Sequence, residues 1–322
     1  MYRGGIPGNI WGRTGQKKRS SLINRLIPKA KSIEVVKINM NIISGAFQIS
    51  KQAHYQKMHR EIQKKAEQEQ VLSIVRTLRN THPRMGTRKL LRKIKPEMRA
   101  NDLKMGRDQL FEVLRSEKML VYPRKTRRIT TIPGLWRTPN LLPGMTITQP
   151  NQVWVADITY LEVEVIRFVF LFLLMDLYSR YIVGWTISPT LEAKGALQCL
   201  LMALQKQRKT NTSLIHHSDH GSQYSSRKYT KKLTDNEIRS SMGEVGNCYD
   251  NIYAERVIGT LKNEYLLGDL FVNIQQIGLA TMQAINAYNT DRPHLSINYV
   301  SPYEAYFDRE LQLPAIMIPE KI

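Results

Sequence analysis

The sequence predicts two parts of different fold class: a basic, all-α front region and an α/β domain behind it. Apolar residues recur at helical spacing in the first part, whereas beyond Pro150 they alternate with polar residues as they do in strands. The charge divides near the same place. Residues 1–132 hold 31 Lys+Arg against 9 Asp+Glu, and residues 133–322 hold 17 against 18. The whole formal excess of +21 therefore comes from the front part.

The composition excludes several classes of protein. Two cysteines, Cys199 and Cys248, are too few for a disulfide framework or a cysteine-rich zinc module. The longest unbroken apolar run, Phe168 to Met175, is far shorter than the roughly 20 residues of a membrane span, and the N-terminus lacks the apolar segment of a signal peptide. We therefore expect a cytoplasmic protein with no membrane partner. A folded chain with this charge is expected to bind a polyanion.

The front part is expected to contain a flexible basic arm at residues 1–41, a helical DNA-binding region at 42–121 and a Pro-rich basic linker at 122–150. Residues 42–57 fit a helix-turn-helix whose second helix is capped by Ser50. The alternatives are a plain helical bundle with a solvated basic face, or a basic arm attached to an unrelated enzyme.

Three further helices are predicted in this region, at residues 56–80, 86–95 and 107–118. Two basic helical modules would bind DNA stepwise, and their cations would neutralise phosphates. The residues that we expect to contact DNA lie in the helices and at the head of the linker: Lys51, Gln52, Arg88, Lys89, Arg124, Lys125, Arg127 and Arg128.

The second part begins with three predicted antiparallel strands. In the first, residues 153–160, period-2 alternation puts Asp157 on the face of Val153 and Val155. A carboxylate on an apolar face is costly unless it has a use. The apolar run 168–175 predicts a central strand buried on both faces. The third strand is expected at residues 181–186.

The elements that follow complete a mixed sheet with flanking helices. We expect a helix at 191–209, a strand at 214–218 that ends at Asp219, a helix at 223–233, a strand at 238–242, and a final helix from Asp250 to Tyr265. This order predicts a ribonuclease-H-like α/β domain with a mixed five-stranded sheet over residues 151–310 and a tail at 311–322. In the last helix, Asn251, Glu255 and Lys262 share one face.

Three acids are the candidate catalytic and metal-ligating residues: Asp157, Asp219 and Glu255. Crowded carboxylates raise one another's pKa values unless divalent cations neutralise them. Hard oxygen ligands with open positions suit Mg²⁺, for which Mn²⁺ can substitute. Two such ions about 3.5 to 4 Å apart would activate an attacking oxygen and stabilise the leaving one at a phosphodiester. The alternatives are three separate structural acids, and a metal site that includes His216 and His217.

Several segments carry a resemblance to a known family. They are Trp154–Tyr160, His217–Tyr224, Gly246–Asn251, Ala254–Arg256, Thr260–Glu264 and Tyr288–His294. With 35 residues between Asp219 and Glu255, and Lys262 seven positions after the Glu, residues 42–308 resemble the integrase-core transposases of bacterial insertion sequences. Within these, the match is to the family with two overlapping reading frames and a copy-out, paste-in cycle.

The resemblance implies a DDE transposase with a retroviral-type integrase core. Asp157, Asp219 and Glu255 would hold two Mg²⁺ ions, a water would cleave at the terminal inverted repeats, and the freed 3′-hydroxyl would attack target or partner-end DNA. Lys262 would contact DNA beside the scissile bond, and Asn251 would assist. The front region would recognise the repeats.

The resemblance also implies partners. These are double-stranded DNA, further copies of the chain in at least a dimer on the DNA ends, and the protein of the upstream frame. The family's upstream leucine zipper is not evident in residues 1–50, which points to the product of the downstream frame. A nucleoid-associated location in the bacterial cytoplasm follows from DNA binding.

Two other functions compete with this interpretation. One is a catalytically silent, domesticated transposase that acts as a DNA-binding regulator, against which the intact acids and Lys262 argue. The other is a ribonuclease-H-like nuclease that hydrolyses but never joins. The two basic modules and the lack of a fourth well-placed acid disfavour it.

Overall fold

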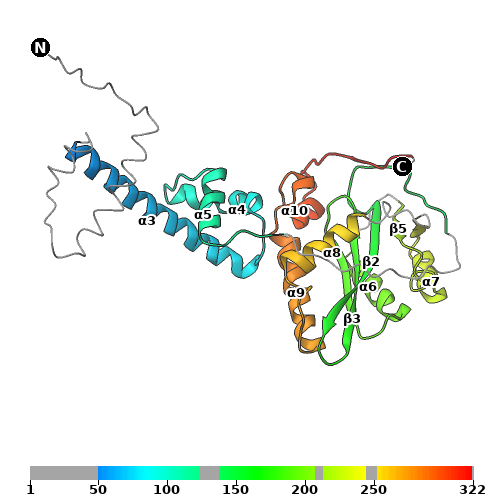
Figure 1. Cartoon of the computed structure of the whole chain (residues 1–322). Coiled ribbons are helices and arrows are strands. Elements are labelled where there is room, and N and C mark those ends of the chain that lie inside the picture. The colour runs from blue at the N-terminus through cyan, green and yellow to red at the C-terminus, as the bar shows by residue number, and fades with distance from the viewer. Residues whose placement is uncertain (1–49, 123–137, 207–212, 244–251, 321–322) are drawn as a thin grey trace, which may run out of the picture. The chain divides into compact units, whose positions relative to one another are not determined.

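The computed structural model describes residues 50–122, 138–206, 213–243 and 252–320, shown as coloured ribbon in Figure 1. It divides into two compact units between Val71 and Leu72. The first unit contributes the start of helix α3. The second contains the remaining helices and the whole sheet, so the helices that follow α3 belong to the same unit as the α/β domain.

Helix α3 is a single element, Lys51–Thr81. The Ser50 hydroxyl accepts a hydrogen bond of 3.1 Å from the Ala53 N–H, which is the predicted N-terminal cap. The sequence-based prediction of separate helices at 50–57 and 56–80 is wrong, because no Gly or Pro interrupts this stretch and the helix continues through it. The first helix of the expected helix-turn-helix, at residues 42–49, lies outside the described residues.

Helices α4 (Thr87–Ala100) and α5 (Arg107–Ser116) pack against each other. Both were predicted, although α4 extends five residues beyond its expected end at residue 95. Each buries one apolar stripe at helical spacing: Leu90, Ile94 and Met98 in α4, and Leu110, Val113 and Leu114 in α5.

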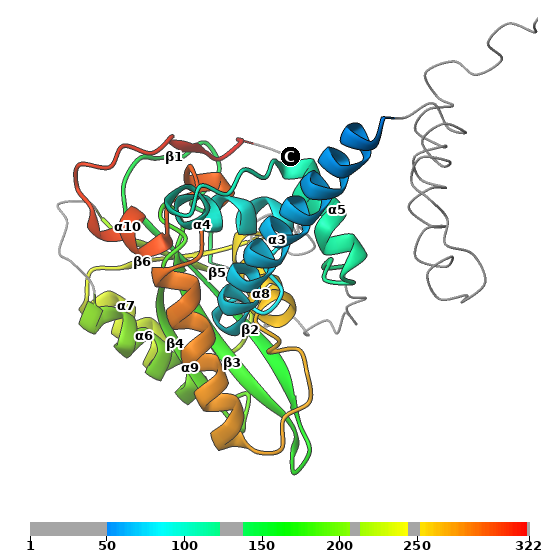
Figure 2. The same ribbon diagram turned by 90° about the vertical axis from the view of Figure 1, so that its left-hand side faces the viewer.

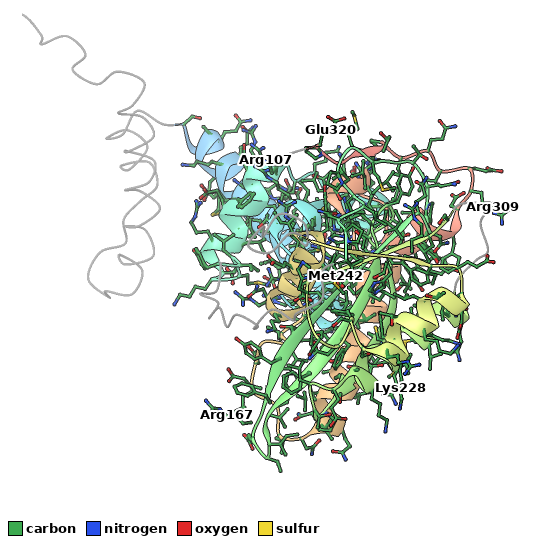
Figure 3. All side chains as sticks on the ribbon, turned by 90° about the vertical axis from the view of Figure 1, so that its right-hand side faces the viewer. Arg107, Arg167, Lys228, Met242, Arg309 and Glu320 are labelled. Carbon is green, nitrogen blue, oxygen red and sulfur yellow. The ribbon has the colours of Figure 1, made fainter. Side chains whose placement is uncertain are left out.

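The predicted five-stranded mixed sheet is confirmed, in the order β4-β3-β2-β5-β6. Its strands are β2 (Val153–Val163), β3 (Arg167–Asp176), β4 (Ile182–Ser188), β5 (Ile215–Ser218) and β6 (Arg239–Met242). The first three are antiparallel, whereas β5 is parallel to both β2 and β6. Figure 3 shows Arg167 at the tip of the long β2–β3 hairpin. This connectivity is that of the expected ribonuclease-H-like domain.

Helices cover both faces of this sheet, as Figures 1 and 2 show. Val153 and Val155 lie in one core with α8 (Ile252–Glu264) and α9 (Ile274–Thr290). Trp154 and Ala156 face the opposite core, with α6 (Ala193–Lys206) and α7 (Arg227–Asp235). The alternation read from the sequence thus assigns each side chain of the strand to a layer. Because α9 and α10 (Pro302–Phe307) follow α8, the expectation that α8 is the final helix is wrong.

The ends of the domain pair with each other. Strand β1 (Thr146–Ile147) is antiparallel to β7 (Ile316–Met317). Leu142 and Ile147 are buried in the domain core, so part of the stretch expected as linker, and part of the expected tail, pack on the domain. The apolar side chains between the prolines account for this. Among the described helices, none combines the length and hydropathy needed to cross a membrane.

Burial of His216 makes the stability of the domain pH-dependent. The side chain is 1% exposed, its Nε2 lies 2.7 Å from the Tyr229 hydroxyl, and burial lowers its pKa to about 3. The folded-state pKa is below the unfolded value near 6.5, so stability is present above pH 6.5 and is lost as the pH falls below it.

We therefore predict that wild type loses about 2 kcal/mol more stability between pH 7 and pH 5 than His216→Gln does. Urea unfolding at the two pH values measures the difference. Asp157 and Asp176, whose pKa values are raised, contribute with opposite sign, but they do so in both proteins and cancel. Equal pH dependence in the two proteins would contradict the prediction.

Candidate active site

Two aspartates meet at the edge of the sheet because β2 and β5 are parallel. Val155 is paired with His217, and the pairing ends there. Asp157 lies two residues beyond Val155, and Asp219 lies two residues beyond His217, so continuing the register places the two aspartates opposite each other. Neighbouring strands lie about 4.8 Å apart. Two aspartates that are 62 positions apart in the chain are thereby brought close together.

The environment of Asp157 disfavours its charged form. The carboxylate is partly buried, and its Oδ1 accepts a hydrogen bond of 2.8 Å from the Ile158 N–H. Burial, and then the negative charges of Asp219 and Glu255, raise the pKa of Asp157 to about 8, although the Ile158 N–H and Lys262 oppose the shift. A bound cation would remove the repulsion within such a group of carboxylates.

Asp219 is oriented by the turn that follows β5. Its Oδ1 accepts a hydrogen bond of 3.0 Å from the Gly221 N–H, and burial raises its pKa. A Cβ added at Gly221 would lie 3.0 Å from this Oδ1 and 2.8 Å from Oε1 of Gln223. Gly221 therefore leaves the space that the carboxylate occupies. Gly221 was not among the predicted site residues, although a Gly two residues after a strand-end Asp is the signal of such a turn.

Helix α8 brings a third acid and a base to the same face of the sheet. Its buried residues pack in the core below β2, and Glu255, in the first turn, remains exposed. Lys262 lies two turns later, with its ammonium 4.5 Å from the centroid of the Tyr160 ring. Burial lowers the pKa of Lys262, against the charges of Asp157 and Glu162. The structure thus brings the predicted Asp219, Glu255 and Lys262 within electrostatic range of Asp157.

The donor set of this site suits Mg²⁺ in its chemistry. Asp157 and Asp219 supply hard oxygen atoms just beyond the last residue pair of β2 and β5, Val155 with His217. Among the described residues, no three His, Cys, Asp or Glu side chains already form a metal-binding cluster. The pairing of β2 with β5 brings the two aspartates of the expected metal site close together.

The two histidines near Asp219 belong to the interior. His216 contacts the rings of Tyr224 and Tyr229, and Nδ1 of His217 lies 2.9 Å from the Ser241 hydroxyl. Both side chains are buried. Their partners are hydroxyl and aromatic groups of the core, which agrees with a structural role and not with the alternative metal site.

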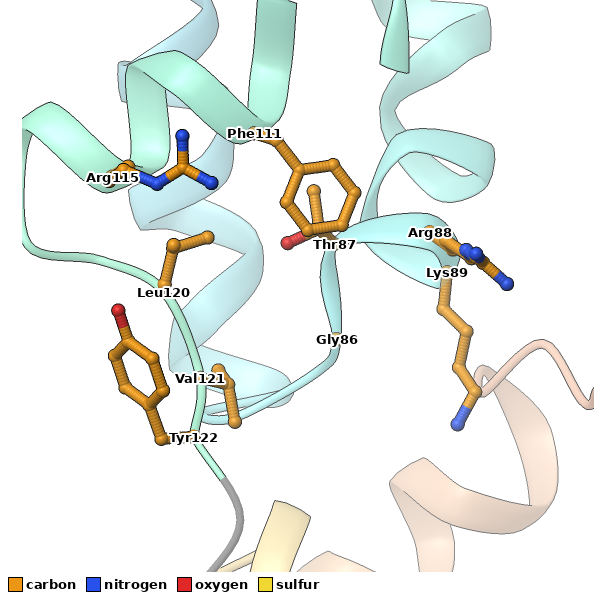
Figure 4. Close-up of a pocket in the computed structure, with 9 residues that line it drawn as sticks. All are labelled: Gly86, Thr87, Arg88, Lys89, Phe111, Arg115, Leu120, Val121 and Tyr122. Carbon is orange, nitrogen blue, oxygen red and sulfur yellow. The ribbon is translucent and has the colours of Figure 1, made fainter. Parts of the chain in front are cut away.

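The expected DNA contacts have different environments. Gln52 on α3 and Arg88 on α4 are exposed. Lys89 is half-buried, and its Nζ lies 3.0 Å from Oε1 of Glu264. Arg88 and Lys89 lie at the wall of a pocket of about 420 Å³ that also includes Phe111, and Figure 4 shows Lys89 pointing away from that ring. The side chain of Lys51 and all of Asn251, Arg124, Lys125, Arg127 and Arg128 lie outside the described structure.

Two family models match the chain, and both are described as an integrase core domain. The first matches residues 147–248, and the second matches residues 236–302. Together they span the sheet, α8 and α9. A solved structure of the HTLV-2 integrase catalytic core domain in complex with magnesium also matches, at 17% identity and a TM-score of 0.38, over 52% of this chain and 99% of that one.

Curated relatives come from bacterial insertion sequences. The transposase for insertion sequence element IS629 of Shigella sonnei is 36% identical over 49% of this chain, and the match spans about half (52%) of that relative's length. The 31 kDa protein of insertion element IS600, also from Shigella sonnei, is 34% identical over 66% of this chain and 78% of its own length. The similarity thus extends from the sheet into the helical region. The chain belongs to the bacterial insertion-sequence transposases with an integrase core.

Proposed function

We propose that this protein binds the terminal inverted repeats of a mobile element and catalyses metal-dependent cleavage and transfer of DNA strands. The observation that carries the proposal is the parallel pairing of β2 with β5, next to which Asp219, Glu255 and Lys262 all act electrostatically on Asp157. Membership of the integrase-core family supports the proposal. Since a fold alone does not define a function, the proposal rests on the site residues.

Asp157, Asp219 and Glu255 would hold the divalent cations, two Mg²⁺ ions for which Mn²⁺ can substitute. When bound, the ions would polarise the phosphodiester and the attacking oxygen. The protein's own residues do the rest. The Gly221 N–H would hold Oδ1 of Asp219 in place, and Lys262 would offer a cation for a phosphate beside the scissile bond.

The substrate and partners are part of the same proposal. Double-stranded DNA of the element ends, and then of the target, would lie on the basic front region. Because an element has two ends, we propose at least a dimer on the DNA, in which the upstream-frame protein can take part.

Asp219→Asn tests the chemistry directly. The amide keeps the shape of the side chain but supplies one poorer metal ligand, so we expect cleavage and joining of terminal-repeat DNA with Mg²⁺ to fall by at least about 100-fold. DNA affinity, measured by fluorescence anisotropy, should stay within a factor of about two. Asp235→Asn, at an exposed acid paired with Lys231, is the matched control and should react like wild type. Undiminished strand transfer by Asp219→Asn would refute the proposal.

Gly221→Ala tests the preorganisation of Asp219. The new methyl group would displace Oδ1, so the Mg²⁺ concentration for half-maximal cleavage should rise by about tenfold or more, with little change in melting temperature. Gly278→Ala in α9, where a Cβ would meet nothing within 4 Å, is the control. An unchanged Mg²⁺ requirement in Gly221→Ala would show that the turn does not orient the carboxylate.

Arg88→Ala tests the role of α4 in DNA binding. Loss of one phosphate contact should weaken binding to all sequences alike and reduce the slope of log K against log salt by about one. Titrations at several salt concentrations measure this slope. Lys228→Ala, an exposed base on α7 that is labelled in Figure 3, should leave it unchanged. Identical slopes for Arg88→Ala and wild type would show that Arg88 does not contact a DNA phosphate.

A further inference from the structure

The end of α8 is held by a partly buried ion pair. Arg292, which follows α9, is 3% exposed. Its Nε donates to Oε2 of Glu264 at 2.9 Å, and its Nη2 donates to Oε1 at 3.0 Å. A bidentate pair of two planar groups fixes direction as well as distance. Glu264 is the last residue of α8, so the pair ties the end of α8 to the end of α9.

Residues of the helical region join this pair. Nζ of Lys89 on α4 donates to Oε1 of Glu264 at 3.0 Å, and both side chains are 22% exposed. The backbone N–H of Arg84, just before α4, donates to the main-chain oxygen of Glu264 at 3.1 Å. That bond satisfies a carbonyl that the end of a helix leaves without a partner. The side chain of Glu264 thus binds α4, and its main chain binds the segment that leads into α4.

A second contact lies beside the first. Nε2 of His82 is 2.7 Å from Oδ2 of Asp291, and its Nδ1 is 3.0 Å from the Tyr265 hydroxyl. Burial lowers the pKa of His82, so its neutral ring can donate to the carboxylate and accept from the tyrosine. Lys93 on α4 also pairs with Asp291. We refer to the residues of the two contacts as the docking cluster: His82, Lys89, Lys93, Glu264, Tyr265, Asp291 and Arg292.

The lysines of α4 differ in whether they take part in the docking cluster. Lys89 and Lys93, one turn apart, face the α/β domain and are paired with its acids. Lys95, in contrast, is exposed and lies outside the docking cluster. The positive charges of Lys89 and Arg292 repel each other. The negative charge of Glu264, which lies beside both, offsets this repulsion.

We propose that Glu264 is a positioning residue, which couples the docking of α4 to the orientation of α8 and hence of Glu255 and Lys262 on that helix. Lys262 is two residues from Glu264, and Glu255 is nine residues away, or about 13.5 Å along a rigid helix. Movement of the held end would displace both functional side chains. The proposal rests on the proposed function for the roles of Glu255 and Lys262, whereas the coupling itself depends on the docking cluster alone.

The test uses Lys89→Gln in the full chain, because this variant removes the α4 side chain that contacts Glu264 and leaves the Glu264–Arg292 pair intact. Without DNA, we expect hydrogen exchange at the last turn of α8 and residues 265–268 to become about tenfold faster, with β2 and β3 unchanged. Single-turnover cleavage at saturating terminal-repeat DNA with Mg²⁺ should slow by about tenfold or more, because a displaced catalytic helix lowers the rate of the chemical step. DNA affinity and its salt slope should stay as in wild type.

Two further variants separate positioning from other roles. Lys89→Arg keeps the charge and should restore both exchange and cleavage rate. Lys95→Gln removes an exposed lysine of the same helix and should change neither. A variant Glu264→Gln, whose folding is checked by its melting temperature, should reproduce the exchange change of Lys89→Gln.

The outcomes are distinguishable. If Lys89→Gln exchanges like wild type at the end of α8, the coupling is refuted whatever the activity. If exchange accelerates but the cleavage rate at saturating DNA does not fall, the positioning role is refuted. A lower DNA affinity and a smaller salt slope with a normal rate would make Lys89 a phosphate contact. If the wild-type chain does not cleave, the proposed function fails, and the exchange measurement still decides whether α4 and α8 are coupled.

Discussion

The parallel pairing of β2 with β5 is the interaction on which the candidate site depends. It comprises three residue pairs, from Val153 with Ile215 to Val155 with His217, and both strands are buried there. A slip of one residue in this register would move Asp219 by about 3.3 Å along β2, relative to Asp157. It would also turn the side chains of the slipped strand to the opposite face of the sheet. Strand β6 holds β5 from its other side through four pairs, so the register is fixed by burial and by hydrogen bonds on both edges.

The sequence predicted the elements whose periodicity is strong. The alternation around Asp157 identified β2 and its face, and the apolar run identified β3, because these patterns are dictated by burial. Glu255 and Lys262 followed from helical spacing on α8. The sequence was less informative where one local composition fits several structures. The break predicted inside α3 has no residue that would cause it, and Pro content suggested a linker where Leu142 and Ile147 are in fact buried.

The rest of the site depends on contacts between residues that are far apart in the chain. Lys89 and Glu264 are separated by 175 positions, and nothing local to either residue indicates the other. From the sequence alone, Lys89 on its basic helix was expected to contact DNA. The fold shows that its charge is paired with Glu264. Glu264 and Arg292 lie in segments that resemble the family, but the resemblance did not show that the two bind each other.

The docking cluster also changes what the charge division means. The front part carries the positive excess, yet two of its bases, Lys89 and Lys93, are neutralised by acids of the nearly neutral α/β domain. Fewer cations of the front part are therefore available to phosphates than its total suggests, and the acids of the domain serve partly to hold the helices that precede it. Salt screens exposed charges over about 8 Å at physiological strength but acts less on half-buried pairs. If the front part binds DNA as proposed, rising salt should weaken that binding before it separates α4 from α8, so that α8 keeps its orientation.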